Sequence, residues 1–303
     1  LPELIAMTTE VVQQIPGVEA AVMTIGKDKP HGIRSNWFNP FDFDVPLAGL
    51  QHFLPGQPVE KNGQLSGGAT LLRFARLGPA RITAGFDTEI ADGYLEETQG
   101  SADAGNRPQG RHYDYDVWQY LAAPYAQAEL PLAARWTLRG GLRFEWLRYD
   151  YDNRMPDGNT RDDGSACTPP CLYNRPADRS DNFTTLAPNL GLLFRLDPEN
   201  SFYLTLARGF RAPQAAELYR LQAGQNVADL KSETIDSLEL GWHHQTAHLN
   251  LSAATFTMHK NHYILQDSNR YNVSDGESRH LGVELEAEAR SDNGLYAGLA
   301  ATW

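Results

Sequence analysis

The chain has 303 residues, enough for one large β domain or two ordinary domains, with a formal net charge of −12 and a pI of about 5.2. Such an acidic chain is poorly suited to nucleic-acid phosphates, so we expect no nucleic-acid partner. The mean hydropathy is −0.47, and no apolar run approaches the roughly 18 residues that a membrane helix needs. This excludes helical spans. It leaves membrane-spanning strands open, because they bury only alternate residues in lipid.

The first 58 residues carry little strand pattern. Residues 1–50 are the hardest to interpret, and 36–58 are rich in proline and aromatic residues, which predicts irregular structure. From residue 67 the alternation of apolar and polar residues becomes strand-like, and 67–77 and 81–90 are predicted to form a hairpin around Gly78 and Pro79. The polar, glycine-containing segment 91–116 is predicted to be a loop, because nothing in it can build a core.

The clearest strand of the sequence is 136–146. Apolar side chains occupy one parity, and arginine, threonine and glutamate occupy the other, over about the length of a tilted membrane-spanning strand. The pattern changes phase after Trp146, which indicates either a bulge or a strand that leaves the bilayer. Further strands, including a hairpin around Lys260, are predicted at 118–130, 183–196, 202–207, 238–243, 248–259, 261–267, 281–289 and 295–303.

The connections differ in length at the two ends of these strands. The turns at 131–135 and 197–200 are short, whereas 91–116, 152–182 and 210–231 are long. A soluble β-sandwich would also place arginines on its outer face, so no single strand decides between a soluble sandwich and a membrane barrel. Short turns at one end and long loops at the other are typical of an outer-membrane barrel. We therefore predict an all-β fold: an antiparallel transmembrane β-barrel, partial, with about a dozen of the ~22 strands of a larger plugged barrel.

Several short motifs occur in order in the second half of the chain. They are Ala207-Arg208-Gly209-Phe210-Arg211-Ala212-Pro213, Glu217-Leu218-Tyr219, Leu230-Lys231-x-Glu233, Leu238-Glu239-Leu240-Gly241 and His280-Leu281-Gly282-Val283-Glu284-Leu285-Glu286. Together they resemble the mid-barrel signature of TonB-dependent outer-membrane receptors. The resemblance extends from about Gln51 to the end of the chain. It implies a barrel portion at 51–303, and it leaves 1–50 as either a remnant of the plug domain or an unrelated segment.

The resemblance implies a receptor in the outer membrane of a Gram-negative bacterium, surrounded by outer-membrane lipid. Its cargo would be a scarce nutrient, most commonly a ferric siderophore. Energy would come from the TonB complex, which acts through a plug that is not fully present here. We expect no cofactor and no covalent chemistry. A porin-type passive channel and an outer-membrane barrel enzyme remain as alternatives. The enzyme would use the carboxylates of Glu284, Glu286 and Glu288, which alternate along one strand. The ordinary interpretation of these glutamates is that they face a water-filled lumen.

The sequence supports haem as the cargo less well than a ferric siderophore. Haem receptors of this superfamily follow a Phe-Arg-Ala-Pro box with a histidine and then Asn-Pro-Asn-Leu. Here the box Phe210, Arg211, Ala212 and Pro213 is present, but no histidine separates Pro213 from Leu230.

Arginine and tyrosine in the long loops would suit an anionic chelate, because the guanidinium pairs with carboxylates and the ring covers apolar faces. Ordinary solvation is at least as good an interpretation for any single residue. The candidates are Arg111, His112, Tyr113, Arg161, Tyr173, Arg175 and Arg179.

Two other sets of residues could suggest special chemistry. Cys167 and Cys171 flank Pro169-Pro170 in the longest loop, and we predict a disulfide between them rather than a metal pair, because no histidine lies nearby. His244 and His248 would share one face of a helix, but in a strand they lie ~13 Å apart, so we interpret them as polar hairpin residues. We predict no metal site.

Overall fold

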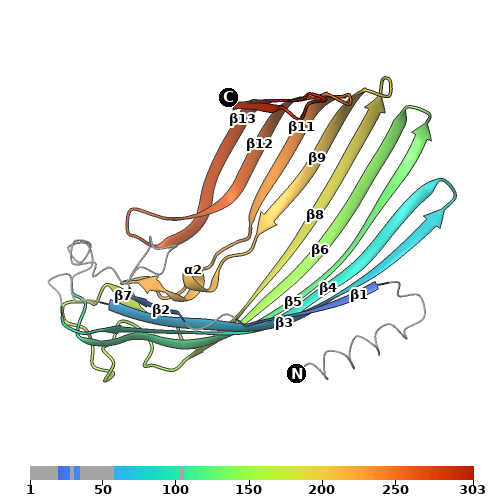
Figure 1. Cartoon of the computed structure of the whole chain (residues 1–303). Helices are drawn as coiled ribbons and strands as arrows, with labels where there is room; N and C mark the ends of the chain where they lie inside the picture. Colours follow the sequence, from blue (N-terminus) through green and yellow to red (C-terminus); the bar gives the residue numbers. More distant parts are fainter. Residues whose placement is uncertain (1–19, 28–30, 35–57, 103–105) are drawn as a thin grey trace.

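The computed structural model describes residues 20–27, 31–34, 58–102 and 106–303. Within these residues, twelve strands form one antiparallel sheet in the order β1-β3-β4-β5-β6-β8-β9-β11-β12-β13-β14, with β2 also paired to β3. The sheet curves but does not close in this part of the chain (Figure 1). The strands are β1 (Ala20–Lys27), β2 (His31–Arg34), β3 (Pro58–Leu77), β4 (Ala80–Gln99), β5 (Gly110–Ala133), β6 (Trp136–Asn153), β8 (Arg179–Arg195), β9 (Asn200–Arg211), β11 (Glu233–Gln245), β12 (Leu249–Gln266), β13 (Asn272–Arg290) and β14 (Tyr296–Thr302).

Three small elements lie in the connections. β7 (Tyr173–Asn174) pairs with β10 (Leu221–Gln222), and the one-turn helix α2 (Ala215–Tyr219) precedes β10. Among the described residues, no helix has the length and apolarity to span a membrane. The antiparallel sheet confirms the predicted all-β, partial barrel architecture. Most of segment 1–50 lies outside the described residues, and of it β1 and β2 both pair with β3.

The outward face of the sheet carries continuous rows of apolar side chains. In one row Leu240, Leu204, Leu192 and Leu138 stand directly opposite one another on β11, β9, β8 and β6. Opposed residues point to the same side of a sheet, so the row forms one surface. Leu204 and Leu240 are exposed, Leu138 and Leu192 are half-exposed, and Leu281, in another row of this face, reaches 81% exposure. A band of this kind is what a hydrocarbon environment requires.

The inward face is polar over the same span. In the parallel row, Glu239 is opposite Thr205, and Arg139 is opposite Glu129. Gly241 lies on the same face in the next row, opposite Tyr203, whose hydroxyl donates to Glu239 at 2.6 Å. A Cβ at Gly241 would lie 2.2 Å from the Tyr203 ring. The glycine of the Leu-Glu-Leu-Gly motif therefore makes room for this ring and for the bond that it carries.

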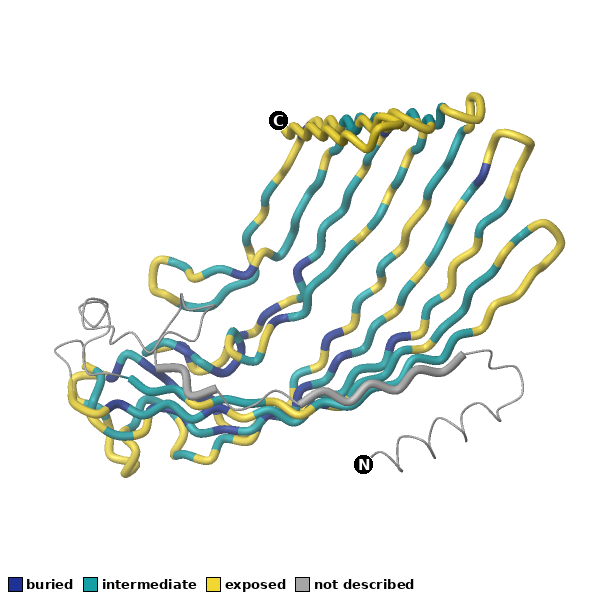
Figure 2. The backbone as a smooth tube through the Cα atoms, in the orientation of Figure 1, coloured by how far each residue is buried: buried dark blue, intermediate teal, exposed yellow. Residues whose placement is uncertain are grey.

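The buried core lies at only one end of the sheet. Short turns gather at the opposite end, whereas the connections 100–109, 154–178 and 212–232, with β7 and α2, gather at the core end (Figure 1). Most buried residues lie towards this long-loop end (Figure 2). The cluster comprises Leu95, Tyr113, Tyr115, Val117, Leu147, Tyr149, Tyr151, Cys171, Tyr173, Phe183, Leu218, Tyr219, Leu221, Ala228, Leu230 and Ile264. The folded loops thus supply the apolar cover for the inward face here.

The prediction of a loop at 91–116 was wrong. β4 continues to Gln99 and β5 begins at Gly110, so the connection spans only 100–109. The segment is polar because its outward side chains, such as Asp114 and Asp116, lie beyond the apolar band. Its inward neighbours Tyr113 and Tyr115 are buried in the core cluster.

Two further predictions are corrected. Of the two interpretations of the phase change after Trp146, the bulge is excluded, because β6 pairs with β8 in unbroken register there. The inward side chains beyond this point, Leu147, Tyr149 and Tyr151, are apolar because they belong to the core cluster. No hairpin turns at Lys260, since β12 runs through it as one strand. The irregularity is a register shift between Lys260 and Tyr263, with His262 at a φ of 55°.

Candidate functional site

Arg175 organises the longest loop, 154–178. Its side chain is 1% exposed and donates to the carbonyl oxygens of Pro156, Thr160 and His112 at 2.7–2.8 Å. The guanidinium also lies over the ring of Tyr173, with its carbon 5.3 Å from the ring centroid. A guanidinium can satisfy several carbonyls at once because its five N–H groups are fixed in one plane. The loop therefore takes its shape from one buried side chain.

His112 lies where several segments meet. Its Nδ1 is 3.1 Å from Glu97 Oε1 on β4, and its Nε2 is 2.8 Å from the carbonyl oxygen of Pro108. Its ring stacks on that of Tyr173, with centroids 4.6 Å apart. The other carboxylate oxygen of Glu97 accepts from Arg220, which follows α2 and also donates to Glu60 on β3 at 2.8 Å.

The pKa of the Glu97 carboxyl reflects two opposing effects. Burial by itself would raise it, but the hydrogen bond from His112 and the positive charge of Arg220 hold it below its ordinary value. Glu97 lies on the loop side of the apolar band, and its lowered pKa keeps it ionised at neutral pH. The charged groups fasten the loops to the strands rather than leaving charges free.

The Phe-Arg-Ala-Pro motif builds a second fastening point. Arg211 donates to Glu217 of α2 and to Glu233 at the start of β11, with all four bonds at 2.9–3.0 Å. Glu233 also accepts from the backbone N–H of Ile264 at 2.9 Å and lies 3.0 Å from Nζ of Lys260. This buried carboxylate thus joins α2, β9, β11 and the irregular part of β12.

The remaining motif residues are structural. Leu218 and Tyr219 are fully buried, and the Tyr219 ring stacks on Tyr151 with centroids 4.2 Å apart. The Tyr219 hydroxyl donates to Asp181 at 2.9 Å. Burial raises the pKa of this hydroxyl, so it acts as a hydrogen-bond donor. Arg211, Glu217, Leu218 and Tyr219 of the signature therefore hold the connection that contains α2 against the sheet.

The seven predicted ligand residues comprise two that are exposed, four that are buried and one, Arg179, that is intermediate. Arg111 and Arg161 have exposed side chains, and Arg111 pairs with Asp114. His112, Tyr113, Tyr173 and Arg175 are buried in contacts between loops and strands, and the Tyr113 hydroxyl donates to the carbonyl of Leu221 at 3.1 Å. Arg179 pairs with Asp181. The structure thus brings most of them together, but only Arg111 and Arg161 have exposed side chains, and the charge of Arg111 is paired with Asp114.

A disulfide joins Cys167 and Cys171, with their Cα atoms 5.4 Å apart. Asn159 clasps this turn: its carboxamide oxygen accepts from the Cys171 N–H, and its nitrogen donates to the Cys171 carbonyl, both at 2.8 Å. A groove runs between this turn and the connection 106–109, with Arg107, Arg161, Asp162 and Asp163 among its lining residues. No cluster of three or more His, Cys, Asp or Glu that could hold a metal occurs within 58–102 and 106–303.

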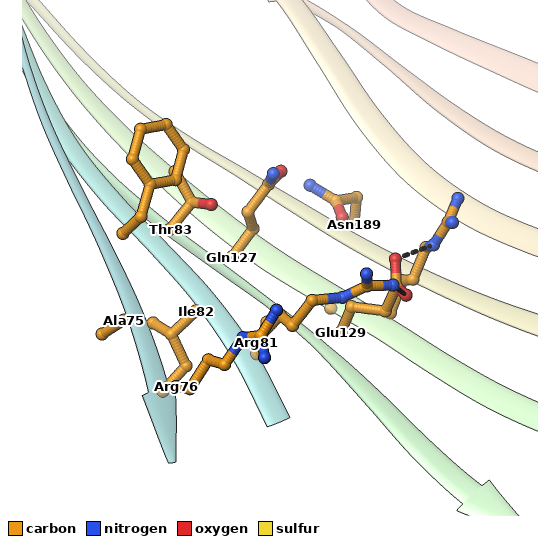
Figure 3. Close-up of a pocket in the computed structure, with 12 residues that line it drawn as sticks. Ala75, Arg76, Arg81, Ile82, Thr83, Gln127, Glu129 and Asn189 are labelled. Carbon is orange, nitrogen blue, oxygen red and sulfur yellow. Dashed lines mark hydrogen bonds and ion pairs between the residues drawn. The ribbon is translucent and has the colours of Figure 1, made fainter. Parts of the chain in front are cut away.

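The inward face also carries a basic patch near the short turns. Arg76, Arg81, Glu129 and Arg139 stand opposite one another on β3, β4, β5 and β6. Glu129 accepts from both Arg81 and Arg139 (Figure 3). Gln127, Thr83 and Asn189 line the same hollow. Three cations against one anion leave this part of the wall positive.

Comparison with known proteins decides the family. The model of a family described as TonB dependent receptor-like, beta-barrel, matches residues 28–303. The chain belongs to the TonB-dependent receptor family. TonB-dependent receptors are β-barrel proteins of the Gram-negative outer membrane, so the apolar band faces lipid and the expected localisation is confirmed. The family is one of receptors rather than enzymes, as expected.

Solved structures of TonB-dependent receptors share the fold. The copper transporter OprC superposes with a TM-score of 0.61 at 18% identity, covering 82% of this chain and 39% of that one. The ferric yersiniabactin uptake receptor FyuA of Yersinia pestis superposes with a TM-score of 0.55 at 18% identity, covering 82% of this chain and 37% of that one. The ferric-catecholate import receptor Fiu of E. coli superposes with a TM-score of 0.55 at 17% identity, covering 81% of this chain and 38% of that one. The present chain thus spans less than two fifths of each. A search of curated proteins finds no match.

Sequence reasoning missed four residues that hold the loop end of this receptor together: Glu97, Arg220, Glu233 and Lys260. Glu97 lay inside the supposed loop, and Lys260 lay at the supposed turn. Glu233 carried a usable signal, since it belongs to a quoted motif and follows a long connection. Arg220 had none, because its partners Glu60 and Glu97 are more than 100 residues away in sequence.

Proposed function

We propose that this receptor takes up a scarce nutrient across the outer membrane and that its cargo is a ferric siderophore. Energy would be supplied by the TonB complex, acting through a plug domain. The observation that carries the proposal is the family match over residues 28–303. Two of the structural neighbours named above are receptors for ferric chelates and one is a copper transporter, so a chelated metal is a cargo consistent with the fold.

The long-loop end supports an anionic chelate. Long loops of outer-membrane barrels lie outside the cell, where cargo arrives first. Here Arg161 has an exposed guanidinium group, and Arg111 has one that a chelate would share with Asp114; such groups bind carboxylates and catecholate oxygens by charge-assisted hydrogen bonds. Arg161 also lines the groove beside the disulfide, so a chelate held there would contact both the loop and the connection 106–109.

Uptake of ⁵⁵Fe-labelled chelates by cells that carry the full-length receptor tests the proposal. Catecholate, hydroxamate and citrate chelates are compared, with Cu²⁺ alone as a further probe. We expect one ferric chelate to accumulate, and accumulation to stop in a strain that lacks TonB. Accumulation that persists without TonB would instead indicate a passive channel. Transport of Cu²⁺ but of no ferric chelate would contradict the siderophore proposal.

The affinity of the same cells for the labelled chelate distinguishes residues that bind it from residues that do not. Replacing Arg111 or Arg161 by alanine is expected to weaken chelate binding about two- to fivefold, because each exposed charge pair contributes on the order of 0.5–1 kcal/mol. Arg195→Ala, at the short-turn end, is the matched control and should leave the affinity unchanged. Equal effects from all three variants would contradict binding at the loops.

A further inference from the structure

A basic hollow lies on the inward face of the sheet near the short turns. Its charged residues form one row across β3, β4, β5 and β6, namely Arg76, Arg81, Glu129 and Arg139. Glu129 accepts from both Arg81 and Arg139, whereas Arg76 has no carboxylate partner among the described residues. A guanidinium has five N–H groups, so the two arginines held by Glu129 keep free donors. Three arginines against one glutamate leave two positive charges unbalanced.

Uncharged donors and a ring complete the basic hollow. Gln127, Thr83 and Asn189 lie on the same side of the sheet (Figure 3). Gly141 separates Gln127 from Asn189, and a Cβ on it would lie 2.7 Å from Nδ2 of Asn189, so the glycine lets this amide lie over β6. Phe74 adds an apolar side chain that is 49% exposed. The hollow measures about 640 Å³, inside the range of roughly 300–1,000 Å³ that small-molecule sites occupy.

The same concave face is negative on β11, β12 and β13. An acidic hollow there is lined by Glu239, Glu284 and Glu286, together with Ser252 and Tyr203. No lysine or arginine of the described residues lines it. Unbalanced charges on low-dielectric walls focus the electric field between them. An anion inside the barrel is therefore repelled from the acidic hollow and drawn to the basic one.

We propose that the basic hollow is a second binding site for an anionic metal chelate, which it holds on the barrel wall between the extracellular loops and the short turns. The site rests on the function proposed above and narrows the class of cargo. Two unbalanced positive charges fit a chelate that keeps at least two negative charges, such as a carboxylate or catecholate complex. An uncharged hydroxamate complex has nothing to offer the arginines.

Cysteine labelling of the full-length receptor in detergent micelles tests the site without transport. Thr83→Cys is treated with sulfonatoethyl methanethiosulfonate, which is negative, and with its positive trimethylammonium analogue, each rate being divided by that of a free thiol. The anionic reagent should react about fivefold faster or more, and Ser252→Cys, in the acidic hollow, should show the opposite preference. Equal rates at Thr83→Cys would overturn the proposal. Failure of both reagents would also overturn it, because an acidic segment of the receptor itself then fills the hollow.

Ligand protection and one charge variant identify the groups that bind. Ferric citrate, an anionic chelate, should slow the labelling of Thr83→Cys about threefold or more, whereas an uncharged ferric trihydroxamate should not. Arg76→Gln, added to Thr83→Cys, should lower the preference for the anionic reagent about two- to fivefold and weaken the protection. The control is Arg73→Gln, three residues earlier on β3 and on its outward face. Equal effects of the two variants would show that the row of arginines is not the site.

The outcomes separate this site from the proposed uptake. Protection by ferric citrate in micelles, with no chelate accumulating in cells, would leave the wall site standing and reject uptake of a ferric chelate. Accumulation of a ferric chelate without protection of Thr83→Cys would leave uptake standing and reject the wall site. Accumulation of an uncharged hydroxamate complex alone would reject the anionic class of cargo.

Discussion

At the scale of single residues, the charged side chains of this receptor differ in role according to where they lie along the strands. Inward-facing arginines near the short turns line a wet wall, as Arg81 and Arg139 do around Glu129. At the loop end, several charged side chains are instead buried and paired. Glu233 is the clearest case, since its carboxylate has three partners on two strands: Arg211 on β9, and Lys260 and the N–H of Ile264 on β12.

The stability contributed by Glu233 should depend on pH. Burial opposes ionisation, but the hydrogen bonds from Arg211, Ile264 and Lys260 lower the pKa of this carboxyl from 4.5 to about 2. Because the folded pKa is the lower one, the contribution is complete above about pH 4.5 and is lost as the pH falls towards 2. Glu233→Gln should lower the free energy of unfolding at pH 7 by about 1–3 kcal/mol, since the buried donors lose their charged partner.

Urea unfolding of the receptor in micelles, measured at pH 7 and between pH 5 and 3, provides the check for Glu233. The unmodified receptor should lose more stability than Glu233→Gln over the acid range. The exposed Glu277→Gln should change unfolding by less than about 0.5 kcal/mol. Parallel acid profiles for the unmodified receptor and Glu233→Gln would contradict the assigned role.

At the scale of the strand, the direction in which a side chain points determines whether it faces lipid or the interior of the barrel. Leu204 and Thr205 are neighbours on β9, and each stands opposite residues of the same character on the next strands: Leu204 opposite Leu192 and Leu240, Thr205 opposite Gly191 and Glu239. One position therefore faces hydrocarbon and the other faces the interior. The same substitution should have very different effects at the two positions.

We expect Leu204→Arg to lower the free energy of unfolding of the receptor in lipid vesicles by about 2–4 kcal/mol, the usual effect of arginine near the bilayer midplane. Thr205→Arg places the charge beside Glu239 on the wet face and should change stability by less than about 1 kcal/mol. Denaturant titrations of the receptor in vesicles measure both. Similar losses at the two positions would show that β9 does not separate lipid from lumen.

Period-two alternation predicted nearly every strand within the apolar band, because there the two faces meet two different media. It failed beyond the band. At 91–116 both parities are rich in polar or aromatic side chains, and Tyr113 and Tyr115 are buried only because distant loops cover them. The loop contacts were not predictable for the same reason: Arg220 is ionically paired with Glu60, 160 residues away. Local sequence shows which residues can pair, but not which do.

At the scale of the whole molecule, the two ends of the sheet are built differently. Turns of a few residues close one end, and folded loops with their own core close the other (Figure 1). In outer-membrane barrels the long loops face outward and the short turns face the periplasm. Two exposed alanines test this orientation without disturbing any contact: Ala177 before β8 and Ala134 between β5 and β6.

A large maleimide reagent that cannot cross the outer membrane should label intact cells that carry Ala177→Cys but not those that carry Ala134→Cys. Both should be labelled after the cells are broken. The receptor without either substitution is the background control, because Cys167 and Cys171 are joined in a disulfide. Labelling of Ala134→Cys in intact cells would reverse the assigned orientation.

The way in which Arg175 holds the longest loop has a consequence for immune recognition. Three of the carbonyls that it binds belong to that loop itself, those of Pro156, Thr160 and Arg161. The surface-exposed tip, 162–170, is therefore carried on a frame whose shape comes from a side chain that no antibody can reach. Mutations at the tip can alter an epitope while the frame persists, so escape variants need not sacrifice the folded loop.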